Sequence, residues 1–344
     1  MASNPKLEFY KFELNSTTNG KKKTFRDFAI EELKADKTAS NDEAFKLCFA
    51  HFIKTIESKH AKSDKKKKTI TIIANAKTNP YLSSKPAPNI KKHTISGVIN
   101  GGPYDKDAIV SDIADKENNS ILGRNKSILL PYFVFVYLPS DYHQGFFAIH
   151  SNSAAESVTA IFRSYISNLF SGKNYNKAIP EAFCPQSFQD EFRKGATIKN
   201  LTFSTTIIDN SHSTDPIQSL LQEYSIKIEA TPKGKGRAIS INKGQKVIDF
   251  FEQKIFKAKN DKELPLNKFT KKSLVAENDV TKKTKVFEWD KKDDDFVPTV
   301  LLTGRIKIKD GIPDFEELKK LCTNVFEDEI LKELRPDLNA RKVN

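Results

Sequence analysis

The feature that most constrains the fold of this chain is one apolar run, SILLPYFVFVYLP at residues 127–139. A membrane-spanning helix needs about 20 apolar residues, so this run is too short to cross a bilayer. It also carries prolines at positions 131 and 139, which do not suit a continuous helix. We therefore interpret the run as a buried strand and expect no membrane insertion.

The residues after this run predict a β-β-α unit. Residues 141–144 form a turn, and GFFAIH at 145–150 is the second strand of a hairpin. Residues 153–170 then follow a helical period, and Ser153 with Glu156 forms a capping box at its start. The apolar stripe of this helix comprises Val158, Ile161, Phe162, Tyr165, Ile166 and Leu169.

Further helices and strands are intermixed along the chain without regular alternation. Strands are predicted at 6–14, 69–74, 93–100, 197–207, 224–230, 237–241, 285–289 and 299–308. Helices are predicted at 24–34, 40–58, 244–257 and 314–334, and Ser40 with Glu43 caps the second of them. Short turns join several strand pairs, which indicates antiparallel pairing. The fold class is therefore α+β, with amphipathic helices packed on mostly antiparallel mixed sheets.

The length of 344 residues suggests about two domains. A turn-rich stretch at 171–195, which contains Pro180 and Pro185, is the candidate boundary. We predict one α+β domain at 1–175 and a second at 176–344.

The composition indicates a folded cytoplasmic protein. Hydrophobic residues make up 38% of the chain, which is enough for a sizeable core. Three cysteines, Cys48, Cys184 and Cys322, lie far apart, and an odd, sparse set fits a reducing compartment. Residues 1–9 lack the apolar core of a secretory signal.

The charge of the chain is both large and segregated. Lys and Arg exceed Asp and Glu by 57 to 44, and a net charge of +13 attracts anionic partners. Residues 59–104 carry ten lysines against the single acid Asp64, whereas 105–117 carry five acids against Lys106 and Lys116. A uniformly Lys-rich composition would not produce this segregation. The tract at 59–104 therefore predicts phosphate contact, with Tyr81 stacking on a base; the alternative is a solvated loop that confers solubility.

A second basic segment, PKGKGRAISINKGQK at 232–246, lies in the predicted hairpin region 231–246. Its glycines at 234 and 236 allow a close approach to a phosphate backbone. The spacing differs from that of a nucleotide-binding P-loop, because no Gly-Lys-Ser/Thr opens a helix here. The alternative is an ordinary flexible hairpin. A third candidate is HSNS at 150–153, where a helix N-terminus offers amides to an anion or is simply capped.

No catalytic or metal-binding motif stands out. The six histidines are scattered, no Cys-x-x-Cys or His-Glu-x-x-His occurs, and we expect neither a metal nor a cofactor. A nuclease needs grouped carboxylates and a nearby lysine. Asp215 with Glu229 fits poorly, because Thr231 stands where a lysine is required. Cys184 has no nearby histidine, so a buried thiol is the expected role.

We therefore expect non-enzymatic binding of nucleic acid, preferably double-stranded DNA, through phosphates and with low sequence specificity. The predicted contact residues are Lys65, Lys66, Lys67, Lys68, Lys91, Lys92, Lys233, Lys235, Arg237 and Lys243. Lysine dominates these segments, which favours point-charge contact over bidentate reading of bases. The two basic segments should then share one face of the protein.

Two alternatives from other classes remain open. One is an interaction subunit that docks an acidic protein, for example in a bacterial anti-phage or mobile-element complex. The other is a divergent metal-dependent nuclease.

Overall fold

The computed structural model describes residues 5–340, apart from 18–21, 74–84, 112–113, 116, 153–156, 210–221, 234–238, 254, 258–262, 266–268, 270, 279–283, 289–299 and 310. The fold is α+β, as predicted. The chain forms two compact units, one comprising Met1–Pro185 with Thr299–Asn344 and the other Gln186–Pro298. The predicted second domain, 176–344, differs from these units because the last segment of the chain returns to the first unit.

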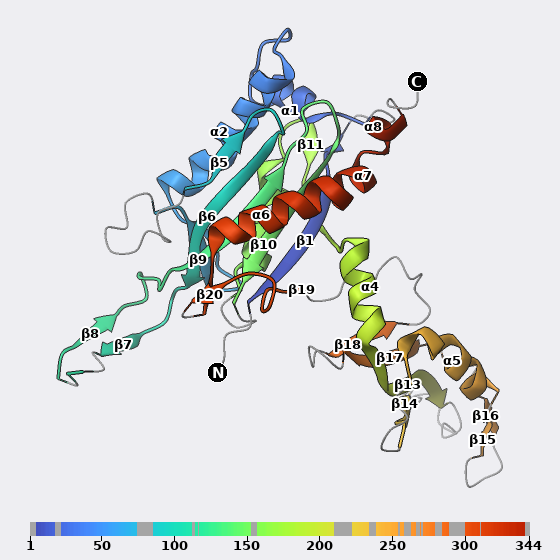
Figure 1. Ribbon diagram of the computed structural model, residues 1–344. Coiled ribbons are helices and arrows are strands. Elements are labelled where there is room, and N and C mark those ends of the chain that lie inside the picture. Colours follow the sequence, from blue (N-terminus) through green and yellow to red (C-terminus); the bar gives the residue numbers. More distant parts are fainter. Residues whose placement is uncertain are drawn as a thin grey trace, which may run out of the picture. The chain divides into compact units, whose positions relative to one another are not determined.

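The first unit is built on one antiparallel sheet (Figure 1). Its main strand order is β12 (Glu181–Phe183), β1 (Lys6–Glu13), β10 (Gln144–Ser151), β9 (Leu130–Tyr137), β6 (Thr94–Pro103), β4 (Lys68–Thr71) and β3 (Ala61–Ser63). Two short strands join this order at its sides, β19 (Val300–Leu301) beside β1 and β5 (Ala87–Asn89) beside β6. The predicted hairpin at 127–150 is confirmed as β9 and β10, with Tyr137 opposite Phe146.

Three helices supply the core on one face of this sheet. They are α1 (Phe25–Glu31), α2 (Asn41–Ser58) and α3 (Thr159–Leu169). The capping box predicted for α2 is confirmed, because the Ser40 amide donates to the Glu43 carboxylate at 2.7 Å and the Glu43 amide donates to the Ser40 hydroxyl at 3.3 Å. The apolar stripes of all three helices, together with Val134 and Val136 of β9, form one buried cluster.

The opposite face of the sheet is covered by the C-terminal helices. The helix α6 (Phe315–Val325) continues through a π-helical turn (Phe326–Ile330) into α7 (Leu331–Leu334), and it crosses the sheet in front of β9 and β10 in Figure 1. The ring of Phe315 stacks on Phe133 at 6.3 Å, and Phe326 lies 5.4 Å from Phe135. Strand β9 is therefore buried on both faces, which explains why its sequence is almost continuously apolar.

Arg335 fixes the end of the C-terminal segment to the β9–β10 turn. Its guanidinium, only 2% exposed, donates two hydrogen bonds of 2.9 Å to Asp141 and two of 2.8 and 2.9 Å to Asp337. It also lies 4.5 Å from the ring of Tyr142. Burial lowers the pKa of Arg335, but the two carboxylates outweigh burial and raise it. The cost of burying this charge is thus offset by two paired acids.

The second unit contains a four-stranded antiparallel sheet, in the order β14 (Gln222–Ala230), β13 (Ala196–Asp209), β17 (Lys271–Asn278) and β18 (Thr284–Glu288). The helices α4 (Gln186–Gly195) and α5 (Gly244–Glu252) belong to it, and β15 (Ile255–Lys257) pairs with β16 (Glu263–Pro265). Its described core comprises Phe192, Ala196, Ile198, Leu201, Phe203, Ile248, Phe269, Leu274 and Ala276.

Several predicted elements are wrong in this second half of the chain. The strand predicted at 224–230 is found within β14, which pairs with β13 from Leu201 opposite Ala230 to Asp209 opposite Gln222. Residue Ser240 instead bridges Thr197, and residues 241–243 form a 3-10 turn that leads into α5. The described part of the predicted partner strand, residues 239–241, therefore contacts β13 rather than β14, and residues 237 and 238 lie outside the described residues. Sequence reasoning also missed α4 and β17.

Two boundaries also need correction. The helix predicted at 153–170 begins at Thr159, whose amide donates to the hydroxyl of Ser157 at 3.2 Å, so the predicted capping box at Ser153 and Glu156 does not start it. These two residues lie outside the described part of the chain. The strand predicted at 299–308 consists of β19 and the separate strand β20 (Ile308–Lys309), which pairs with β21 (Ile312–Pro313).

Replacing Phe162 tests the helix-covered core. This side chain is fully buried and lies 5.1 Å from Phe147 and 6.3 Å from Phe52. We expect Phe162→Ala to lower the free energy of unfolding by about 3–5 kcal/mol, because the surrounding rings cannot close the cavity. Ile179→Ala is the control, since Ile179 is 71% exposed and its loss should change the stability by less than about 0.5 kcal/mol. Equal effects of the two variants in urea unfolding would contradict this core.

Candidate nucleic-acid interface

The sheet divides the predicted lysine tract into two separate clusters. Lys68 pairs with Pro103 at one end of β6, whereas Lys91 and Lys92 lie in the turn that precedes Thr94 at its other end. Strand β6 has ten residues, so its ends are about 30 Å apart at ~3.3 Å per residue. Tyr81, predicted to stack on a base, lies outside the described residues.

The first cluster begins in the β3–β4 turn. Lys65 and Lys66 are exposed there, and the ammonium of Lys67 lies 2.7 Å from the carboxylate of Asp105. Lys62 and Lys67 also lie over the ring of Tyr104, at 5.7 and 6.0 Å. The pKa of Lys67 is raised, first by its hydrogen bond to Asp105. Lys62 and Lys67 therefore stand around one aromatic ring, and Lys65 and Lys66 lie between them in the chain.

A projecting hairpin brings further cations to the same place. Strands β7 (Ala108–Ser111) and β8 (Asn119–Leu122) continue the β6 and β9 segments beyond the sheet (Figure 1), and we call residues 105–126 the arm. At its base the Asp105 amide donates to the Arg124 carbonyl at 3.1 Å, so Arg124 lies beside the β3–β4 turn. We call the following residues the arm-base cluster: Lys62, Lys65, Lys66, Lys67, Lys106, Arg124 and Lys126.

The arm-base cluster is not free of acids. Asp105 pairs with Lys67, Asp107 lies 3.0 Å from Arg124, and Asp64 accepts a hydrogen bond of 2.6 Å from the Tyr104 hydroxyl. The three segments that carry the seven cations, 62–67, 104–107 and 124–126, contain these three acids and no others. Lys68 differs from the other predicted contacts, because its half-buried ammonium donates to the Ser157 carbonyl at 2.7 Å. It therefore holds the start of α3 and is poorly placed for phosphate.

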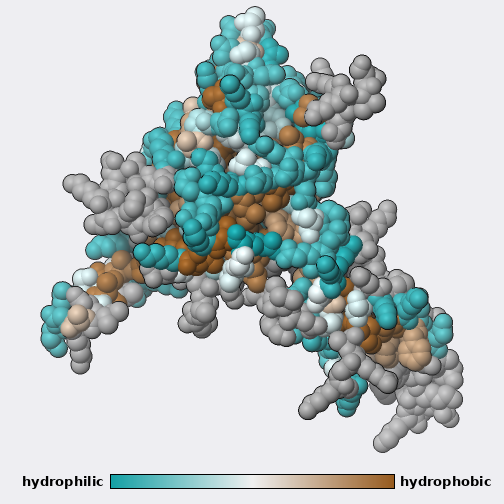
Figure 2. All heavy atoms as spheres, in the orientation of Figure 1, coloured by the Kyte–Doolittle hydropathy of each residue, from teal (hydrophilic) through white to brown (hydrophobic). Residues whose placement is uncertain are grey.

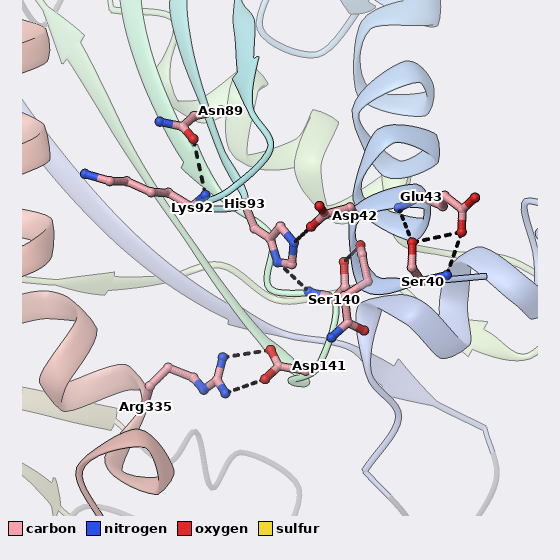
Figure 3. A network of polar contacts seen from close by, with 10 residues as sticks. Ser40, Asp42, Glu43, Asn89, Lys92, His93, Ser140, Asp141 and Arg335 are labelled. Carbon is pink, nitrogen blue, oxygen red and sulfur yellow. Dashed lines mark hydrogen bonds and ion pairs between the residues drawn. The ribbon is translucent and has the colours of Figure 1, made fainter. Parts of the chain in front are cut away.

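The second cluster lines a groove between the β5–β6 turn and α6. Lys91 and Lys92 meet Lys319 here, although more than 200 residues separate them along the chain. Lys92 forms an ion pair with Glu327, and its amide donates to the side chain of Asn89 at 3.2 Å (Figure 3). The cavity measures about 410 Å³, and the rings of Phe135 and Phe326 contribute to its lining. Sequence reasoning missed Lys319, because only the return of the C-terminal helix brings it to this turn.

A serine, a histidine and an aspartate meet beside this groove, but they are not arranged for catalysis (Figure 3). His93 Nδ1 accepts from the backbone amide of Ser140 at 3.4 Å, and Nε2 lies 3.2 Å from the Asp42 carboxylate. The hydroxyl of Ser140 is buried and donates to the Asn41 carbonyl at 2.6 Å. A nucleophilic serine would present its hydroxyl to the imidazole. This network instead ties the β9–β10 turn to α2.

The basic segment of the second unit is described only in part. Lys233 and Lys243 are exposed, whereas Lys235 and Arg237 lie outside the described residues. Lys243 stands in the 3-10 turn before α5. That these residues share one face with the arm-base cluster stays a prediction.

The third candidate, residues 150–153, contains a buried histidine at the end of β10. His150 is fully buried, its Nδ1 accepts from the Phe133 amide at 2.8 Å, and its Nε2 lies 3.1 Å from the Asn152 side-chain oxygen. Burial lowers the pKa of His150 to about 4, although the hydrogen bond to Asn152 opposes this shift. The neutral imidazole accepts the hydrogen bond of the Phe133 amide in place of a backbone carbonyl, so its role is structural. Both of its ring nitrogens already have a partner within the protein.

Among the described residues, no group of three or more His, Cys, Asp or Glu side chains is placed to hold a metal ion. No described helix is long and apolar enough to cross a membrane. None of the three cysteines forms a disulfide and all are buried, and burial raises the pKa of Cys48 to about 12. Comparison with protein-family models, curated proteins and solved structures gives no match.

The buried His150 makes the stability of the first unit depend on pH. Its pKa in the folded protein lies below the ordinary value of 6.5, so the unfolded chain binds the proton first as the pH falls. We expect the contribution of His150 to stability to be present above pH 6.5 and to fall by about 3 kcal/mol as the pH drops to about 4. Urea unfolding between these pH values should show a steeper loss in the parent protein than in His150→Gln. Parallel pH profiles would show that His150 is not held neutral.

Proposed function

We propose that the protein binds nucleic acid, preferably duplex DNA, through phosphate contacts made by the arm-base cluster, and that it does so without catalysis. The observation that carries this proposal is the convergence of seven cations from three chain segments at one end of the sheet. Lysines that serve only to keep the protein soluble could be spread evenly over its surface and would not need to converge. A phosphate backbone does require convergence, because each lysine gains most when it replaces counterions condensed along a continuous row of charges.

The chemistry of the cluster suits contact without sequence reading. Six of its seven members are lysines, which act as point charges, whereas base recognition favours the planar fork of arginine. Its acids do not prevent binding, because the Lys67–Asp105 and Arg124–Asp107 pairs are solvent-exposed. Exposed pairs contribute only about 0–1 kcal/mol, so a phosphate can replace the carboxylate at little cost. The ring of Tyr104 adds a flat apolar surface within the same cluster.

The interaction-subunit alternative keeps one observation in its favour. The arm exposes large aliphatic side chains, which phosphate contact does not use. No observation on the described residues favours the nuclease alternative over these two.

The triple variant Lys65→Ala, Lys66→Ala, Lys126→Ala tests the proposal. We expect it to bind all DNA sequences more weakly and to flatten the slope of log K against log[salt] by up to about 3, or roughly 0.9 for each lost phosphate contact. The measurement is the equilibrium affinity for two unrelated duplexes over a series of salt concentrations, by fluorescence anisotropy.

A matched control removes the same charge elsewhere. Lys46, Lys54 and Lys332 are exposed on α2 and α7, away from the β3–β4 turn, and their triple alanine variant should retain most of the parent affinity and slope. If both triple variants lose affinity equally, net charge rather than the arm-base cluster governs binding. If neither loses affinity, the cluster is not the interface.

A further inference from the structure

The groove between the β5–β6 turn and α6 carries an excess of positive charge. Its charged lining residues are Lys91, Lys92, Lys319 and Glu327. The exposed side of α6 is hydrophilic (Figure 2), and Glu327 is paired with Lys92. Within the part of the chain that the structure describes, neither Lys91 nor Lys319 forms an ion pair. The groove thus presents two ammonium groups without an acidic partner among the described residues.

Two hydroxyl side chains also line the groove. Thr94 and Ser96 are two residues apart on β6, so their side chains share one face of the sheet. This is the face that α6 covers, because Phe135 of β9 lies opposite Ser96 and packs on Phe326. Thr94 is only 6% exposed, and its hydroxyl has no hydrogen-bond partner among the described residues. A nearly buried hydroxyl of this kind gains from an oxygen of a bound ligand.

The turn that carries Lys91 and Lys92 is held in place by its neighbours (Figure 3). The Lys92 amide donates to the side chain of Asn89 at 3.2 Å. His93 has a left-handed φ of 51°, and its ring lies 3.2 Å from the carboxylate of Asp42. Such a backbone conformation persists where the surrounding structure fixes it. The lysines therefore extend from an ordered turn, which lowers the entropy lost when a ligand binds.

The donors of the groove suit an anion that accepts several hydrogen bonds. Ammonium groups only donate, and hydroxyls can donate to charged oxygens. Three lysines and one glutamate leave two positive charges in the lining. A phosphomonoester carries a charge of about −1.5 to −2 at neutral pH and three strong acceptor oxygens. Both its charge and its acceptors therefore match the groove.

The size of the groove indicates a ligand larger than phosphate alone. Its cavity of about 410 Å³ lies within the range of roughly 300–1,000 Å³ that is typical of small-molecule sites. Phe135 and Phe326 offer it little surface, because they are only 3% and 2% exposed. Pro88 is exposed and Ile90 is half-buried, so these two residues supply accessible apolar surface beside the lysines. That surface suits the carbon skeleton of a phosphorylated ligand.

We propose that this groove binds a small phosphomonoester, about the size of a sugar phosphate or a mononucleotide, whose phosphate contacts Lys91, Lys319 and the hydroxyl of Thr94. Lys92 can join them, because its ion pair with Glu327 is exposed and such pairs stabilise a fold only slightly. The site lies at the end of β6 opposite the arm-base cluster. It therefore does not depend on the proposed binding of nucleic acid.

Isothermal titration calorimetry of the full chain with AMP and with glucose 6-phosphate tests the site. We expect at least one of them to bind with one ligand per chain and more tightly than inorganic phosphate. Adenosine, which lacks the phosphate, should bind at least about tenfold more weakly than AMP, because hydrogen bonds to charged groups are the stronger ones. Binding of neither phosphomonoester, or adenosine binding as tightly as AMP, would overturn the proposal.

Variants of the lining assign the binding to this groove. Lys91→Ala with Lys319→Ala should weaken the binding of the phosphomonoester by at least about tenfold, and Thr94→Val, which removes only a hydroxyl, by about two- to tenfold. The matched control is Lys46→Ala with Lys54→Ala, which removes the same charge from the exposed side of α2 and should bind like the parent. Equal binding by the parent and the Lys91 and Lys319 variant would contradict the site.

A second control separates this site from the arm-base cluster. The triple variant Lys65→Ala, Lys66→Ala, Lys126→Ala should bind the phosphomonoester as the parent does, whether or not it has lost affinity for DNA. Loss of phosphomonoester binding in this variant, with binding retained in the Lys91 and Lys319 variant, would place the anion at the arm base and overturn the proposal.

Discussion

The structure depends on the burial of β9 from both sides of the sheet. Helices α1, α2 and α3 cover one face, but the cover of Phe133 and Phe135 on the other face comes from the C-terminal helix, which follows the whole second unit in the sequence. The first unit therefore completes its core only when that segment returns. Arg335 holds the returned segment, because its buried guanidinium satisfies Asp141 in the β9–β10 turn.

The same sheet positions both candidate surfaces. Continuing β6 and β9 beyond the sheet creates the arm and gathers cations at its base, while the start of β6 and the returning α6 form the groove. The arm-base cluster and the groove therefore lie at opposite ends of β6.

Local pattern predicted much of the first unit. The apolar run, the helical stripe around Phe162 and the Ser40 capping box depend on neighbours in the sequence, and β9, α2 and the body of α3 are found where expected. Pairing between segments that are far apart along the chain does not produce a local sequence pattern, so it was not predicted. The ion pair of Lys92 with Glu327 joins residues 235 apart, and β14 pairs along its length with β13. For that reason the sequence showed an unopposed lysine tract, whereas the fold supplies Lys67 and Lys92 with carboxylates and separates the tract into two clusters.

The most direct test of phosphate contact at the arm base is lysine footprinting of the folded protein. Acetylation of each lysine would be measured by mass spectrometry with and without a saturating DNA duplex. The account predicts that DNA protects Lys62, Lys65, Lys66 and Lys126, while Lys46, Lys54 and Lys332 react equally in both states. Protection confined to other lysines, or no change at the arm base under conditions where DNA is bound, would contradict it.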